Sequence, residues 1–92
     1  MKLKAAERNE LLTTLSREGA KATEAARALE PTVPGILAHT VRELAAIRAY
    51  FNEERVYDWQ VGARWRNLCS QIAYAKQGLY ARFGDNGDAY LA

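Results

Sequence analysis

Two side chains with catalytic potential, His39 and Cys69, each occur only once in the 92 residues of the sequence. A histidine can act as a general base and a cysteine as a nucleophile, but each needs a partner that activates or orients it. One histidine and one cysteine supply neither a histidine-based triad nor the ligands of a zinc site. The run GDNGD at 84–88 resembles part of a calcium loop but lacks the alternating oxygen ligands and the closing glutamate. We therefore expect no enzyme, no metal and no cofactor.

A second set of residues has the chemistry of a binding surface. Two large aromatic side chains, an arginine and small or polar residues recur every three or four positions, so that a helix would place them on one face: Trp59, Ala63, Arg66, Ser70, Tyr74 and Gln77. Tyrosine, tryptophan and arginine are the residues that concentrate binding energy at interfaces. This face is interpreted as a partner surface, for protein or for nucleic acid. The alternative is a central helix that buries both of its sides.

The element that must carry this face is a long C-terminal helix. Seven apolar residues follow helical spacing on its opposite side: Val61, Trp65, Leu68, Ile72, Ala75, Leu79 and Phe83. A helix over 56–83 would be roughly 42 Å long, whereas a compact domain of this size is only about 32 Å across. The helix must either break, at Gly62 or Gly78, or project from the body. We favour projection, with the apolar line joining two copies as a homodimer, and we predict no strand.

Three shorter helices are predicted before it. The first runs from about Lys2 to Glu18, with Gly19 as its end, and buries Ala5, Leu11, Leu12 and Leu15. The second is capped by Thr23 and shows a narrow face of small residues made of Ala22, Ala25, Ala26 and Leu29. Pro31 ends it. The fold class is therefore all-α, a small bundle of about four helices with a long C-terminal helix, in which 1–84 form one domain and 85–92 a tail.

The third helix begins at Pro34, where a missing N–H costs nothing, and extends to about Phe51. Its apolar arc contains Leu37, Val41, Leu44, Ile47 and Phe51, with Arg48 reaching solvent at the rim. The opposite face would expose Ala38, His39, Arg42, Glu43, Ala46, Ala49 and Tyr50. Among these, Arg42 is the side chain best suited to hydrogen-bond base edges.

The stretch from Gly19 to Leu44 resembles the helix-turn-helix of homeodomain-like and recombinase-type DNA-binding proteins. Thr23, Ala26 and Ile36 stand where that family has its cap, its small inter-helix residue and its aliphatic anchor. The turn departs from the family, because Glu30 replaces its glycine and a proline follows. The resemblance implies that the third helix docks on DNA with Ala38, His39 and Arg42. Three basic residues of the last helix, Arg64, Lys76 and Arg82, could add phosphate contacts.

Charge and composition bound the remaining possibilities. Residues 1–54 hold eight basic and eight acidic side chains, whereas 55–84 hold five basic residues against one aspartate. The single cysteine excludes an internal disulfide, and neither a signal peptide nor a membrane span of about 18 apolar residues is evident. We expect a cytoplasmic protein with no membrane contact.

Two hypotheses on function stay open. The first is a DNA-binding regulator with a divergent helix-turn-helix. The second is a protein-binding helical inhibitor or adaptor, such as a phage- or mobile-element-encoded antagonist of the anti-CRISPR type.

Overall fold

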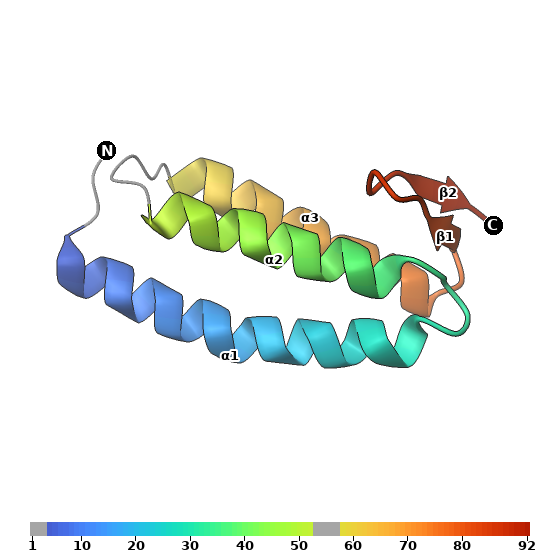
Figure 1. The fold of residues 1–92 in the computed structure, drawn as a ribbon, viewed down its shortest axis with the longest axis horizontal. Helices are drawn as coiled ribbons and strands as arrows, with labels where there is room; N and C mark the ends of the chain where they lie inside the picture. The colour runs from blue at the N-terminus through green and yellow to red at the C-terminus, as the bar shows by residue number, and fades with distance from the viewer. Residues whose placement is uncertain (1–3, 53–57) are drawn as a thin grey trace.

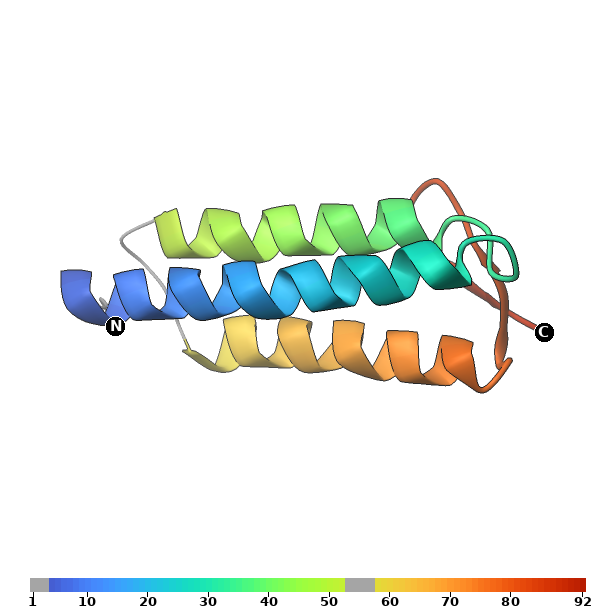
Figure 2. The same cartoon turned by 90° about the horizontal axis from the view of Figure 1, so that it is seen from below.

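Three helices lie side by side in an up-down-up arrangement, and a small β-hairpin lies at one end of them (Figures 1 and 2). The elements of this computed structural model are α1 (Ala5–Leu29), α2 (Ile36–Asn52), α3 (Asp58–Lys76), β1 (Tyr80–Phe83) and β2 (Ala89–Leu91). The bundle is elongated and measures 42 × 20 × 19 Å. The mainly helical architecture was predicted correctly, but the fourth helix, the long C-terminal helix and the absence of strands were not.

The structure describes the backbone of residues 4–52 and 58–92 and the side chains of residues 4–51 and 62–92. The proposed start of the first helix at Lys2 lies outside these residues, as does the side chain of Trp59. None of the helices in the described part combines the length and the apolar character needed to cross a membrane.

The predicted break at Gly19 is wrong, because α1 continues through it to Leu29. Gly19 is buried, and a Cβ atom there would lie 3.3 Å from Cδ2 of Leu44. The glycine therefore allows α2 to approach closely, and the packing of the two helices keeps α1 continuous. Thr23 is not an N-cap: its hydroxyl donates to the Gly19 carbonyl oxygen at 2.8 Å, within the helix.

Glu30 organises the turn between α1 and α2. Its carboxylate oxygens accept hydrogen bonds from the backbone N–H groups of Gly35 at 3.0 Å and Leu37 at 2.9 Å. The first N–H groups of a helix have no partner within it, and the positive end of the helix dipole favours a carboxylate nearby. Glu30, which stands where the helix-turn-helix family has a glycine, thus caps the next helix from the far side of the turn.

We expect Glu30→Ala to lower the free energy of unfolding by about 1–2 kcal/mol, because it leaves two N–H groups of this turn without their acceptor. Glu24→Ala is the matched control: Glu24 lies six residues earlier, within α1, and pairs with Arg27 at the exposed surface, which predicts a loss below about 0.5 kcal/mol. Urea unfolding of both variants measures the difference. Equal losses would show that the Glu30 carboxylate does not cap α2.

The C-terminal helix ends at Lys76 instead of continuing to Phe83. Gly78 adopts a positive φ of 78°, and the N–H of Leu79 donates to the carbonyl oxygen of Tyr74 at 3.1 Å, which reverses the chain. The predicted projection is therefore wrong, and of the two possible break points Gly78 is the one used, while Gly62 lies within α3.

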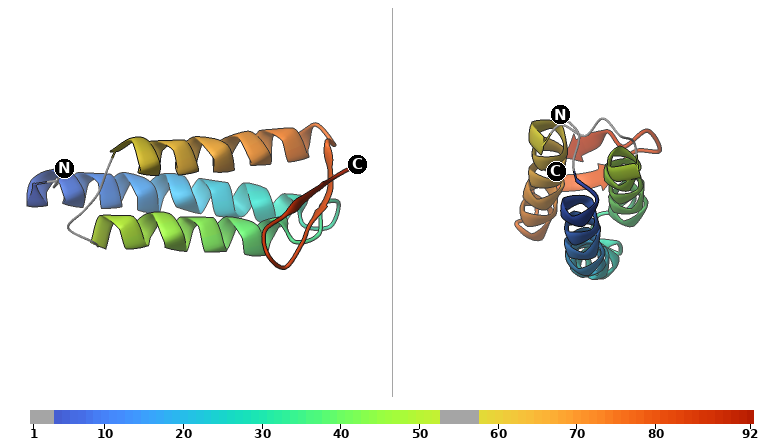
Figure 3. Two further views of the ribbon diagram at one scale, coloured as in Figure 1. Left: turned by 90° about the horizontal axis from the view of Figure 1, so that it is seen from above. Right: turned by 90° about the vertical axis from the view of Figure 1, so that its left-hand side faces the viewer.

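The hairpin that follows turns at the GDNGD run. The N–H of Gly84 donates to the Asp88 carbonyl oxygen at 2.8 Å, and Gly87 has a positive φ of 83°, as expected for a short hairpin loop that ends in a left-handed glycine. Arg82 pairs with Tyr90 and Phe83 with Ala89 in the antiparallel register, with an irregularity between Tyr80 and Arg82. The hairpin lies on the side of the bundle opposite α1, and β2 is farther from α1 than β1 (Figures 1 and 3).

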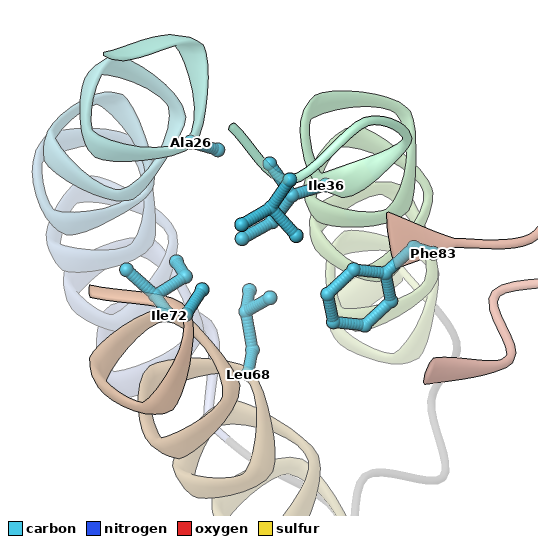
Figure 4. Close-up of a cluster of buried hydrophobic side chains, with 7 residues drawn as sticks. Ala26, Ile36, Leu68, Ile72 and Phe83 are labelled. Atoms are coloured by element: carbon cyan, nitrogen blue, oxygen red, sulfur yellow. The ribbon is translucent and has the colours of Figure 1, made fainter. Parts of the chain in front are cut away.

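The core consists of two clusters along the bundle. The larger one joins all three helices to the hairpin and contains Ala26, Val33, Ile36, Leu68, Ile72, Ala75 and Phe83 (Figure 4). The smaller one is Leu15, Ile47 and Phe51, and both Leu44 and Trp65 pack against the two clusters.

Most of the predicted core side chains are buried or half-buried. Among the described side chains four are exposed, those of Ala5, Leu11, Val41 and Leu79, and the side chain of Val61 lies outside the described residues. Val41 is 51% exposed because the inward face of α2 is centred on Ile36, Thr40 and Ile47, which places Val41 on the outer side.

Candidate functional site

The outer side of α3 carries most of the predicted partner-binding residues, and Gln77 directly follows this helix. Arg66, Ser70, Tyr74 and Gln77 are all exposed, and Ala63 is half-buried. The opposite side of the same helix supplies Leu68, Ile72 and Ala75 to the core. Within the described side chains, α3 therefore buries only one of its faces, so the alternative of a central helix buried on both sides is wrong.

Tyr74 is the aromatic member of this face among the described side chains and lies near its C-terminal end. It is 45% exposed, yet its ring contacts Tyr80 of the hairpin edge-on at a centroid distance of 6.4 Å. Tyr80 in turn contacts Phe83 edge-on at 5.2 Å. A row of aromatic contacts thus connects the exposed Tyr74 ring to the buried core and restricts the positions that the ring can adopt.

Arg66 lies two helical turns before Tyr74, about 12 Å along the helix axis. Its guanidinium group folds back over Gly62, where a Cβ atom would lie 3.1 Å from Nη1 of Arg66. Gly62 therefore leaves room for this side chain to lie along α3. Small residues separate the arginine from the tyrosine, so a partner segment could lie against the helix between them.

The residues predicted to contact DNA are spread over α2, α3 and β1. Ala38 and Arg42 are exposed on α2, and Lys76 is exposed in the last turn of α3. Arg82 is exposed on β1, and its guanidinium carbon lies 3.7 Å from the centre of the Tyr90 ring. The other two members, His39 and Arg64, make contacts within the protein.

His39 does not lie on a solvent face, and this part of the sequence prediction is wrong. Its side chain is buried, Nε2 lies 2.7 Å from Oε1 of Gln71 on α3, and its ring stacks on Phe83 with centroids 4.6 Å apart and an interplanar angle of 17°. His39 therefore joins α2, α3 and the hairpin. The residues that α2 exposes between its ends are Ala38, Val41, Arg42, Ala45, Arg48 and Ala49.

Arg64 forms an ion pair between α3 and α2. Its Nε donates to Oε2 of Glu43 at 2.7 Å, and its guanidinium carbon lies 6.0 Å from the centre of the Tyr50 ring. The hydrogen bond to Glu43 raises the pKa of Arg64, against a smaller opposing effect of burial. Because Glu43 already neutralises this guanidinium, Arg64 is less suited to a phosphate contact than the sequence suggested.

Two depressions lie between the helices. A polar cleft of about 430 Å³ between α2 and α3 is lined by the Arg64–Glu43 pair, Tyr50 and the His39–Gln71 pair. An apolar groove of about 260 Å³ lies between α1, α2 and α3 near the second core cluster, with Leu11, Phe51 and Trp65 in its walls. Neither brings together three or more of the His, Cys, Asp and Glu side chains that ligate metals, as judged on the described residues.

Cys69 is exposed on α3. Partial burial and the nearby Glu18 carboxylate both raise the pKa of its thiol, with burial the larger cause. A raised pKa reduces the fraction of reactive thiolate at neutral pH. This thiol is therefore a weaker nucleophile at neutral pH than an unperturbed cysteine.

The residues that carry the resemblance to a helix-turn-helix differ in how well they fit that motif in the structure. Ala26 and Ile36 are both fully buried, as the small residue and the aliphatic anchor of that motif would be. Thr23 does not cap a helix, and α1 is 25 residues long. No family model, no curated protein and no solved structure matches this chain.

Proposed function

We propose that this chain is a protein-binding helical module that recognises its partner with the outer face of α3. The observation that carries the proposal is Tyr74, which is 45% exposed but is held by Tyr80 and, through it, by the buried Phe83. An exposed aromatic ring that is already ordered loses little conformational entropy on binding. Such rings are frequent energetic centres of protein interfaces.

The charge on this face also favours a protein partner. Arg66 is the charged member of the set that contains Ala63, Ser70, Tyr74 and Gln77. A single arginine between small and aromatic residues fits the composition of a protein interface, whereas nucleic-acid binding generally uses several phosphate contacts.

The DNA-binding regulator stays the alternative. Three of its predicted contacts, Arg42, Lys76 and Arg82, are exposed, and they could meet phosphates without disturbing the core. This alternative predicts binding that weakens steeply as salt is added, roughly in proportion to the number of phosphates contacted.

The proposal is tested with the double variant Arg66→Ala/Tyr74→Ala. We expect it to remain folded and to bind the partner about 100-fold more weakly, since truncation of one or two central residues of an interface commonly has this effect. The matched control is Arg17→Ala/Tyr90→Ala, which removes an exposed arginine from α1 and a tyrosine of nearly equal exposure, 43%, from the hairpin.

The measurement uses the immobilised chain of residues 1–92 to capture partners from a lysate of its source cells, followed by titration of the purified partner in 0.1 M and 0.5 M salt. A protein that the wild type and the control both bind, that the α3 variant loses, and that still binds at high salt supports the proposal. Equal binding by the α3 variant would refute it. Salt-sensitive binding of a DNA duplex that is lost on Arg42→Ala would support the alternative.

A further inference from the structure

The two outer edges of the β-hairpin differ in what they contact. On the outer edge of β1, the N–H of Phe83 donates to the carbonyl oxygen of Pro34 at 2.8 Å, so this edge is closed by the α1–α2 turn. The three residues of β2 are all exposed. An open strand edge presents unpaired backbone groups and is a template for pairing with another strand.

The direction of the backbone groups of β2 follows from its bonds to β1. The carbonyl oxygen of Asp88 accepts from Gly84, and the N–H of Ala92 donates to the carbonyl oxygen of Leu79 at 3.0 Å. Because backbone groups alternate in direction along an antiparallel strand, the N–H and C=O groups of Ala89 and Leu91 are directed away from β1. The described part of the chain supplies them with no backbone hydrogen bond outside the hairpin.

We propose that a second copy of this chain pairs with this edge, β2 against β2 in antiparallel direction, to form a four-stranded sheet across a twofold axis at Tyr90. The two residues whose backbone groups face outward, Ala89 and Leu91, are two positions apart, as antiparallel pairing of two copies of β2 requires. Ala89 would face Leu91 of the second copy, and Leu91 would face Ala89 of the second copy. In each pair, the N–H of either residue would donate to the C=O of the other. Four hydrogen bonds therefore form, and the edge matches itself, as a twofold interface requires.

The side chains at the axis fit the same arrangement. Tyr90 would lie opposite Tyr90 of the second copy in a non-hydrogen-bonded pair, the position at which cross-strand side chains come closest. Each Tyr90 ring already carries the guanidinium of Arg82 from the neighbouring strand, so a row of arginine, tyrosine, tyrosine and arginine would cross the sheet.

The charges of the two copies permit this pairing. The two Arg82 strands would be separated by three strand spacings, about 14 Å, which exceeds the screening length of about 8 Å at physiological salt. The side chain of Asp88 would face that of Ala92 of the second copy, so no two like-charged side chains lie directly opposite each other. This inference concerns the hairpin and does not depend on the partner surface of α3.

The first test is the concentration dependence of the molecular mass, measured by sedimentation equilibrium from about 1 µM to 1 mM. We expect the wild type to be a weak dimer, because the paired edge is short. Leu91→Pro removes the outward N–H without removing a donor to β1, and proline is tolerated at such an edge position. It should weaken dimerisation roughly 30-fold, since two of the four bonds are lost. The control Leu91→Ala, which keeps the N–H, should dimerise within roughly fivefold of the wild type.

The second test locates the twofold axis by disulfide formation in a Cys69→Ser background. Tyr90→Cys would place two cysteines opposite each other with Cα atoms about 4.5 Å apart, within the range of a disulfide. We expect a covalent dimer under mild oxidation. Leu91→Cys should cross-link at least tenfold more slowly, because position 91 lies opposite position 89 of the other copy.

A wild type that is monomeric up to 1 mM would overturn the inference. So would a dimer that Leu91→Pro leaves unchanged, or equal cross-linking at positions 90 and 91. The variant Arg66→Ala/Tyr74→Ala should dimerise like the wild type, so failure of the partner surface and failure of the β2 edge are distinguished.

Discussion

Gly35→Ala is expected to lower the free energy of unfolding by about 3–5 kcal/mol, more than the loss from an ordinary surface substitution. Gly35 has a positive φ of 92°, which L side chains rarely adopt. A Cβ atom at this position would also overlap the carbonyl oxygen of Phe83. Since the obstacle is backbone, no side-chain rotation relieves it, and the hairpin must move away from the α1–α2 turn.

The variant Gly78→Ala separates the two causes of the stability loss expected at Gly35, the left-handed backbone and the overlap with the hairpin. Gly78 also has a positive φ, 78°, but a Cβ atom there meets nothing within 4 Å. It should cost about 1–2 kcal/mol, from the left-handed backbone alone. Urea unfolding gives both values, and amide exchange of the Phe83 N–H, which bonds to Pro34, reports whether the hairpin has left the turn. If both variants lost the same stability, the hairpin would not lie against Gly35.

Phe83→Ala should cost about 3–5 kcal/mol, as expected for truncation of a buried phenylalanine. The ring is buried in the larger cluster, where it stacks on His39 and meets Tyr80 edge-on. Its loss leaves a cavity between α2, α3 and the hairpin and removes the support of the Tyr80 ring on which Tyr74 rests. We therefore expect weaker partner binding as well as lower stability.

Tyr90→Ala is the comparison for Phe83→Ala, because it removes an aromatic ring of the same hairpin that contacts Arg82 at the surface. Its loss should stay below about 1 kcal/mol. Urea unfolding of the two variants measures both stability losses. The exchange rate of the Ala92 N–H, which bonds to Leu79, independently reports whether the hairpin stays formed. A Phe83→Ala variant as stable as Tyr90→Ala would contradict the position of this ring in the core.

Gly35→Ala and Phe83→Ala both disturb the contact between the hairpin and the α1–α2 turn, which lies within the stretch Gly19–Leu44 that resembles a helix-turn-helix. In the structure this stretch is the corner on which the hairpin rests: Glu30 caps α2, Pro34 accepts a hydrogen bond from Phe83, and Gly35 makes room for that strand. The glutamate and the second proline of the turn thus have structural roles that no comparison of the turn with a motif would suggest. Whether the corner also contacts DNA stays a prediction.

The exposed face of α3 could be predicted because it depends on local geometry. Arg66, Ser70 and Tyr74 recur at helical spacing, and a helix that buries Leu68 and Ile72 on one side must expose them on the other. The support of Tyr74 by Tyr80 could not be predicted, because Tyr80 was assigned to the same helix, one and a half turns further on.

The sequence by itself determined the helical character of the chain, the turn around Pro31 and Pro34, and most of the buried residues, because these follow from apolar spacing and from the backbone limits of proline. The tertiary structure decided the rest. Gly19 continues a helix because Leu44 packs against it, whereas Gly78 ends one although the apolar spacing continues past it. Phe83 is buried whether it belongs to a helix or to a strand. In the strand it contacts His39 and Pro34, which lie more than 40 residues away along the chain, and such distant contacts cannot be read from apolar spacing.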